Sequence, residues 1–147
     1  MRTHTIVTGM IGVAVITVAA WLFVFRVLPA HAPAESSTTG HEDLISVSTP
    51  AANDAVTSPL TVTGEARGNW YFEASFPVRV LDANGTVLAA VPVQAQGEWM
   101  TENFVPFHTT LEFESPTTKT GTIVFQKDNP SGLPEFDDEI RIPVRFK

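Results

Sequence analysis

Apolar and polar residues alternate through residues 71–81, which read Tyr-Phe-Glu-Ala-Ser-Phe-Pro-Val-Arg-Val-Leu. A period of two sends successive side chains of a β-strand to opposite faces, so we expect Phe72 and Phe76 to face a core and Glu73 to face solvent. Residues 82–85, Asp-Ala-Asn-Gly, follow directly. Asn-Gly tolerates the positive φ that tight hairpin turns need. The pattern therefore predicts a β-hairpin.

Short apolar runs punctuated by Pro, Gly, Asn and Asp continue to the C-terminus. Their lengths suit strands, and no run shows the 3.6-residue period of a helix. We therefore predict an all-β fold, a seven-stranded antiparallel sandwich. Prolines lack a ladder N–H, so each proline inside or beside a strand predicts an edge or a bulge. The predicted strands are residues 44–49, 60–64, 71–81, 86–93, 105–113, 122–127 and 139–146, and the prolines are Pro77, Pro92, Pro106 and Pro143.

An uncharged apolar run of about 20 residues, long enough as a helix to cross a bilayer core, occupies residues 6–25. We predict a single N-terminal transmembrane helix in a membrane anchor at residues 1–28, then a flexible linker at 29–42 and a domain at 43–147. The alternative is a signal peptide cleaved after Ala34, which would give a secreted protein, although such apolar regions usually span about 7 to 15 residues. Both alternatives export the C-terminal domain.

The charge and the cysteine content of the chain exclude several kinds of site and partner. The chain has no cysteine, which excludes disulfides, thiolate catalysis and Cys-ligated zinc. From Ala30 onward it carries sixteen Asp or Glu residues against seven Lys or Arg residues. Because such an acidic surface repels phosphate groups, we expect no nucleic-acid partner.

Several segments occur in an order that resembles the immunoglobulin-like domain of bacterial spore germination proteins, the type found beside a GerM domain. They include residues 58–64 (Ser-Pro-Leu-Thr-Val-Thr-Gly), 70–76 (Trp-Tyr-Phe-Glu-Ala-Ser-Phe), 97–99 (Gly-Glu-Trp) and 129–132 (Asn-Pro-Ser-Gly). The resemblance covers nearly all of residues 45–146. It implies a seven-stranded immunoglobulin-like sandwich on the outer side of a bacterial cytoplasmic membrane, and it carries over no catalytic or binding residues.

Five residues are candidates for an interaction surface: Trp70, Tyr71, Glu73, Asn129 and Phe136. The aromatic residues lie near predicted strand ends or in loops, where a ring can stack on a sugar or fill a pocket of a partner. Burial in the core is the alternative for Trp70. For Glu73 the alternative is a structural role, either a pair with a cross-strand partner such as Arg79 or hydrogen bonds that close a loop.

We predict no cofactor. The acidic loop at residues 128–139 offers the oxygen ligands that calcium prefers, but its spacing does not match an EF-hand, and a solvated acidic loop explains it equally well. His108 is the one histidine of the predicted domain and falls on a polar parity. With one histidine and no cysteine, the predicted domain offers few of the side chains that form a zinc site or a Ser-His-Asp site. A small hydrolase is therefore a weak alternative.

The sequence thus predicts a non-catalytic interaction module in the cell envelope. Its partner would be an envelope protein or a wall polymer such as a carbohydrate. The alternative is a passive spacer without a dedicated ligand. An exposed apolar patch on particular loops favours the module, whereas evenly polar loops favour the spacer.

Overall fold

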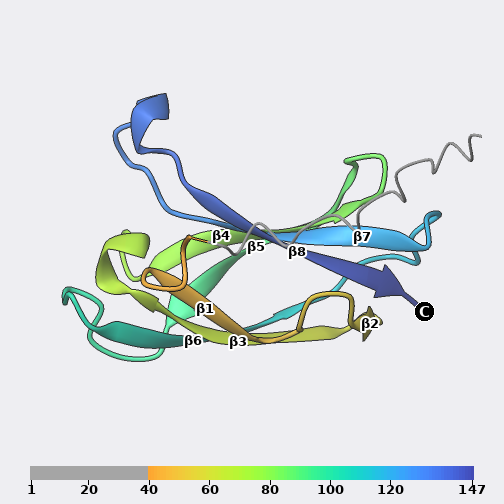
Figure 1. The fold of residues 1–147 in the computed structure, drawn as a ribbon, viewed down its shortest axis with the longest axis horizontal. Coiled ribbons are helices and arrows are strands. Elements are labelled where there is room, and N and C mark those ends of the chain that lie inside the picture. The colour runs from red at the N-terminus through yellow and green to blue at the C-terminus, as the bar shows by residue number, and fades with distance from the viewer. Residues whose placement is uncertain (1–39) are drawn as a thin grey trace, which may run out of the picture. The chain divides into compact units, whose positions relative to one another are not determined.

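The computed structural model describes residues 40–147, which form eight β-strands and two short 3₁₀ turns. Their order along the chain follows the colour gradient of Figure 1. The strands are β1 (Ile45–Thr49), β2 (Ala55–Val56), β3 (Leu60–Arg67), β4 (Ser75–Asp82), β5 (Val87–Ala95), β6 (Phe104–Leu111), β7 (Thr120–Gln126) and β8 (Glu139–Phe146), and the turns are η1 (Gly68–Trp70) and η2 (Pro134–Phe136).

The strands pair in the order β1-β3-β6-β5-β4-β7-β8-β2, and every pair is antiparallel except β2 with β8. Strands β1, β3 and β6 lie in one layer, and β5, β4, β7 and β8 lie in the other (Figure 1). Strand β5 joins the layers through a ladder to β6 of only two residue pairs. The predicted all-β sandwich is confirmed. It has eight strands rather than seven, because β2 has only two residues and is too short to show a periodicity.

Alternation correctly predicts the buried face of the sandwich. Along β4, Phe76, Val78 and Val80 are fully buried, and β8 buries alternate residues in the same way. The Phe76 ring lies edge-on to Tyr71 and to Phe107, with centroid separations of 5.1 and 5.2 Å. Such edge-to-face contacts suit the charge distribution of aromatic rings.

The predicted reversal between β4 and β5 is confirmed. The Gly85 amide donates to the Asp82 carbonyl at 3.0 Å, and Gly85 has a φ of 83°. The Asp82 carboxylate accepts hydrogen bonds from the backbone amides of Asn84 and Thr86, both at 2.8 Å. These hydrogen bonds lower the pKa of Asp82 below its ordinary value, and the bond from the Thr86 amide has the largest effect.

The start of β4 differs from the prediction. The strand begins at Ser75, four residues after the predicted start, because residues 72–75 form a separate tight turn. Phe72, predicted to be buried, is therefore exposed. The period-two pattern extends through Phe72 by coincidence and carries no information about the backbone reversal.

The prediction that each strand proline marks an edge strand or a bulge is wrong. Strands β4, β5, β6 and β8 each have two neighbours in the sheet, and the register shifts fall elsewhere, at Val47/Thr49 and Val80/Leu81. Pro77 opposes Pro92 across the β4–β5 ladder, and the β4–β7 ladder begins one residue later, at Val78. Pro106 pairs with Glu65 of β3 and Pro143 with Thr122 of β7. The carbonyls of Pro106 and Pro143 accept hydrogen bonds on the other side, from the amides of Gln96 and Asn53 at 2.8 and 2.7 Å.

Among residues 40–147 no helix is long and apolar enough to span a membrane. The predicted anchor at residues 1–28 and the predicted linker up to residue 39 lie outside the described residues.

Candidate functional site at one end of the sandwich

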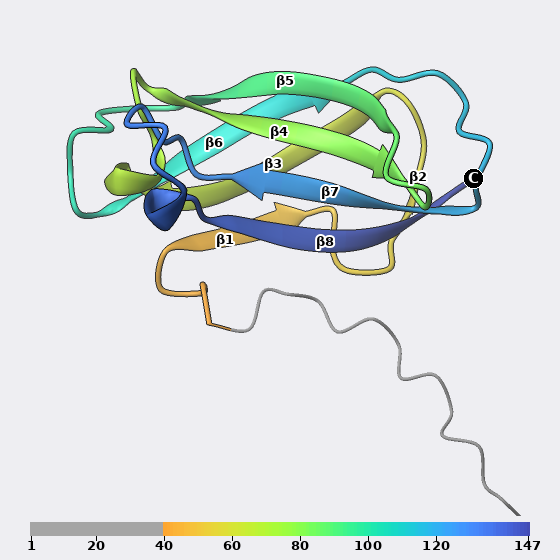
Figure 2. The ribbon, with the colours of Figure 1, turned by 90° about the horizontal axis from the view of Figure 1, so that it is seen from above.

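Four segments meet at one end of the sandwich: residues 40–44, 68–74, 96–103 and 127–138. We call this region the loop end. The Asp128 amide donates to the Trp70 carbonyl at 3.1 Å, and the Arg67 guanidinium donates to the carbonyls of Asp43 and Glu102 at 2.7 and 2.8 Å. Figure 2 shows the first described residues, η1 and the β7–β8 loop at the same end, opposite the C-terminus.

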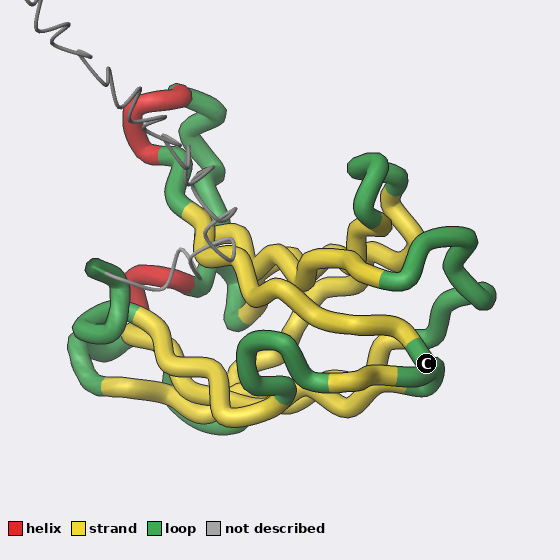
Figure 3. The backbone as a smooth tube through the Cα atoms, turned by 45° about the vertical axis from the view of Figure 1, so that its right-hand side comes forward, coloured by secondary structure: helices red, strands yellow, loops and turns green. Residues whose placement is uncertain are grey.

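Gly68 allows η1 to pack against the β5–β6 loop. A Cβ atom at this position would overlap the backbone carbonyl oxygens of Trp99 and Thr101. Only glycine permits so close an approach between two backbones. The β7–β8 loop instead projects away from the sandwich, with η2 at its tip (Figure 3). The loop end therefore combines a tightly packed base with a protruding arm.

The structure corrects the prediction for Trp70 and largely for Tyr71, because both are buried, although Tyr71 also lines the cleft described below. Trp70 has no exposed surface, and the Tyr71 side chain belongs to the core cluster. The Tyr71 hydroxyl donates to the Val105 carbonyl at 2.7 Å, and burial raises the pKa of this phenol. Both residues fix η1 to the sandwich, the core role expected of bulky aromatics in such folds.

Glu73 is exposed, as predicted, but its backbone conformation is unexpected. The amide of Phe72 donates to the carbonyl of Ser75 at 2.9 Å, and the reverse bond measures 3.0 Å. The two central residues, Glu73 and Ala74, have φ values of 49° and 62°. Neither residue favours the left-handed region, which costs about 1 to 2 kcal/mol per residue. Strain of this kind is often found at functional positions.

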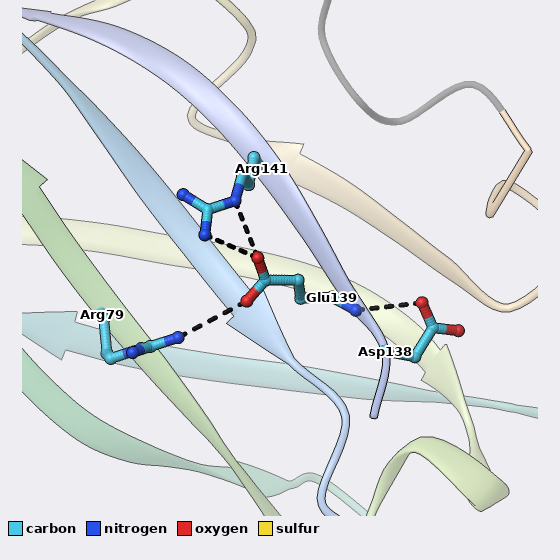
Figure 4. Close-up of polar contacts among 4 residues, drawn as sticks. All are labelled: Arg79, Asp138, Glu139 and Arg141. Atoms are coloured by element: carbon cyan, nitrogen blue, oxygen red, sulfur yellow. Dashed lines mark hydrogen bonds and ion pairs between the residues drawn. The ribbon is translucent and has the colours of Figure 1, made fainter. Parts of the chain in front are cut away.

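The predicted pair between Glu73 and Arg79 is wrong, since the tight turn removes Glu73 from the strand. Arg79 Nη2 instead lies 3.5 Å from Glu139 Oε2, and Arg141 Nε donates to Glu139 Oε1 at 2.7 Å (Figure 4). Within residues 40–147 the Glu73 carboxylate has no ion-pair partner. The structure therefore leaves this charge available at the tip of the turn.

Two exposed phenylalanine rings line a cleft of about 320 Å³ between η1 and the β7–β8 loop. Phe72 is 40 % exposed and Phe136 is 53 % exposed. Asn69, Lys127 and Asp128 contribute polar groups to the same cleft. Phe136 thus lies where an interaction surface was predicted, and Phe72 joins it after being predicted in the core.

Asn129 lines the cleft but is engaged in shaping the loop. Its side-chain amide donates to the Leu133 carbonyl at 2.9 Å and to Asp137 Oδ1 at 2.7 Å. Its Oδ1 accepts from the hydroxyl and the amide of Ser131. Because both ends of this side chain are occupied, Asn129 is better described as the residue that orders the loop than as a ligand contact.

The exposed apolar side chains of the described residues are concentrated at the loop end. Of the five large hydrophobic side chains exposed within residues 40–147, four lie on its loops, and the fifth, Val87, follows the hairpin turn at the opposite end. The four are Phe72, Met100, Leu133 and Phe136. Single exposed hydrophobic residues are common, but a concentration on neighbouring loops is typical of an interaction surface.

The calcium alternative finds no support in the geometry. Within residues 40–147 no three or more His, Asp or Glu side chains gather as metal ligands. In the acidic loop Asp137 accepts from Asn129, and Asp138 Oδ1 lies 2.7 Å from His41 Nε2. His108 is exposed on β6, as its parity predicts.

Comparison with known families agrees with this fold. A family model for the immunoglobulin-like domain of bacterial spore germination matches residues 44–133. The chain belongs to this family. The match extends from the residue before β1 into the β7–β8 loop, so this germination-type immunoglobulin-like domain contains η1, the tight turn and most of the cleft. No curated protein and no solved structure matched the chain.

Sequence reasoning missed Phe72, Met100 and Leu133 as exposed apolar residues. Met100 follows Gly97-Glu-Trp and Leu133 follows Pro-Ser-Gly, so turn-forming residues beside an apolar side chain were the available signal. No such signal exists for Phe72. Its exposure depends on the left-handed turn at Glu73 and Ala74, which their residue types do not favour.

Proposed function

We propose that the protein is a membrane-anchored, extracytoplasmic, non-catalytic interaction module of the bacterial cell envelope, and that the loop end is its binding surface. The observation that carries the proposal is that four of the five large exposed hydrophobic side chains of residues 40–147 lie on loops at one end of the sandwich: Phe72, Met100, Leu133 and Phe136. Membership of the immunoglobulin-like germination family supports a binding role in the envelope. A passive spacer has no need of such an asymmetric surface.

The rigidity of the loop end supports binding through a surface formed before contact. Gly68 and the Asp128–Trp70 bond hold η1 against the β5–β6 and β7–β8 loops, and the Asn129 hydrogen bonds order the β7–β8 loop internally. A surface ordered in advance loses less conformational entropy when a partner binds. The apolar rings of Phe72 and Phe136 then supply the contact area that usually dominates such interfaces.

Affinity capture with the full chain tests the module. The C-terminus lies opposite the loop end, so a C-terminal tag leaves the proposed surface uncovered (Figure 2). Solubilised envelope proteins and isolated cell wall are offered separately to the wild type, to a Phe72→Ala/Phe136→Ala variant and to a Val87→Ala control. We expect saturable retention by the wild type and the control, and its loss in the double variant.

Two outcomes would contradict the proposal. Retention unaffected by the double substitution would remove the loop end from the binding surface, and absence of retention from both fractions would favour the spacer. Steady release of soluble fragments from wall incubated with the protein would contradict a non-catalytic role.

Localisation needs a separate test. A C-terminal alkaline phosphatase fusion should be active, because this enzyme works only after export, and an alkaline carbonate wash should leave the fusion in the membrane fraction. Activity in the culture medium would instead indicate signal cleavage and a secreted protein. An inactive fusion would contradict export.

A further inference from the structure

Charge is distributed unevenly over the described residues. The four segments of the loop end carry nine Asp or Glu residues and a single Lys, Lys127, whereas residues 40–147 as a whole hold fifteen acidic and seven basic residues. The loop end therefore concentrates negative charge. Asp128 lines the cleft together with Lys127, and Glu73 and Glu135 are the sequence neighbours of the exposed Phe72 and Phe136.

Most of these carboxylates have no cationic partner. The ion pairs within residues 40–147 join His41 to Asp138, and Arg79 and Arg141 to Glu139. Arg67 donates to two backbone carbonyls and stacks over the Phe104 ring at 4.4 Å. Within residues 40–147 the carboxylates of Glu73, Asp128 and Glu135 consequently have no ion-pair partner.

From this combination we infer that the cleft and its acidic rim bind a cationic segment of another polypeptide, one that carries an apolar side chain among Lys or Arg residues. The inference rests on the proposed function, because it names the partner chemistry of the same surface. The apolar side chain fits between the Phe72 and Phe136 rings. The flanking cations lie near Glu73 on the tight turn, Asp128 in the cleft and Glu135 on η2.

Charge complementarity decides between this occupant and others. Anionic wall polymers, anionic lipid headgroups and a second copy of the same loop end would all bring negative charge against unpaired carboxylates, which is unfavourable. A neutral glycan could stack on the rings but would gain nothing from the acidic rim. A cationic polypeptide uses both features, and its approach is accelerated by the field of the loop end.

Selection from a random peptide library tests the inference even though the natural partner is unidentified. The library is panned against the full chain held by its C-terminal tag, in parallel with the Phe72→Ala/Phe136→Ala variant. We expect peptides enriched in Lys or Arg together with aromatic or aliphatic residues, and enrichment only on the wild type. Enrichment of acidic or uncharged peptides, or the same peptides on both proteins, would overturn the inference.

A binding measurement with one selected peptide adds the electrostatic test. Raising the salt concentration from about 50 to 300 mM should weaken peptide binding several-fold, since dissolved ions screen the attraction between the carboxylates and the cationic peptide. Glu73→Lys/Glu135→Lys should weaken it by about tenfold or more, because it replaces attraction with repulsion. The matched control Glu112→Lys/Glu114→Lys, placed after β6 at the opposite end, should change it far less. Equal effects of the two charge reversals would contradict a local acidic rim.

The two proposals fail in different ways. Envelope or wall capture that depends on Phe72 and Phe136, combined with no cationic peptide selection, leaves the module intact and overturns the cationic partner. Binding to vesicles of anionic lipid that is lost in the double phenylalanine variant would also overturn it, in favour of a membrane surface. Failure of both capture and selection contradicts the module itself.

Discussion

His41 Nε2 lies 2.7 Å from Asp138 Oδ1, joining residues that are 97 positions apart in the sequence. The His41 ring also lies edge-on to the buried Trp70 indole, with their centroids 6.3 Å apart. His41 falls in the predicted linker, yet it connects the start of the described chain to the base of the β7–β8 loop. The start of the described chain is therefore held at the loop end.

This contact predicts that His41→Ala loosens the β7–β8 loop. Loss of the hydrogen bond should increase amide hydrogen exchange in residues 128–138 and reduce the free energy of unfolding by about 1 kcal/mol. His108→Ala is the matched control, since His108 is exposed on β6. Equal exchange in both variants would show that Asp138 holds the loop without His41.

Phe76→Ala should reduce the free energy of unfolding by about 3 to 5 kcal/mol, the range for truncating a buried aromatic residue. Phe76 is fully buried between Tyr71 and Phe107, so its removal leaves a cavity beneath η1. Chemical denaturation measures this change. A loss below about 1 kcal/mol would be inconsistent with a fully buried ring.

Substitutions at Glu73 separate backbone strain from charge. Glu73→Gly relieves the left-handed φ, whereas Glu73→Ala keeps the strain and removes the same carboxylate. We expect the glycine variant to be more stable than the alanine variant by about 0.5 to 1 kcal/mol in urea denaturation. Both should bind the cationic peptide less tightly than the wild type. An alanine variant as stable as the glycine variant would mean that the turn carries no strain.

Asp82 predicts a pH dependence of stability. Its pKa is lowered in the folded state, chiefly by the Thr86 amide, so its contribution is present above the ordinary pKa of 3.8 and is lost as the pH falls through the lower folded value. Asn in its place does not titrate. The stability difference between wild type and Asp82→Asn should therefore shrink between neutral pH and about pH 2.5. A difference that stays constant over this range would contradict the assignment.

Much of the sandwich follows from period-two alternation, because one face of each strand is buried. The span of β8 and the Asp82–Gly85 reversal match the sequence prediction. The exposure and burial of residues at the loop end are harder to predict from alternation. Phe136 and the exposure of Glu73 were predicted, but the burial of Trp70 and Tyr71 depends on η1, which has no periodic signal. The exposure of Phe72 depends on a turn that its residue types do not favour.

The electrostatic part of the site illustrates a second limit. A net negative charge can be read from the composition, yet its concentration at one end follows from the contacts that bring four separate segments together. Alternation assigns residues to faces of a strand and gives no information about the ends. Loop ends therefore have to be seen in three dimensions before their charge and apolar surface can be compared.

A short ladder limits how far the sandwich closes. The ladder between β5 and β6 comprises Gln94–His108 and Ala95–Phe107, and Pro92 on one strand and Pro106 on the other bound it. Neither proline has an N–H to donate across these strands, although the Pro106 carbonyl still accepts from the Gln96 amide at 2.8 Å. A continuous ladder here would draw the layers toward a closed barrel, in which the strands tilt and the interior narrows. A ladder of only two pairs leaves β5 and β6 free to diverge into separate layers, and the rings of Tyr71, Phe76 and Phe107 contact one another in the core.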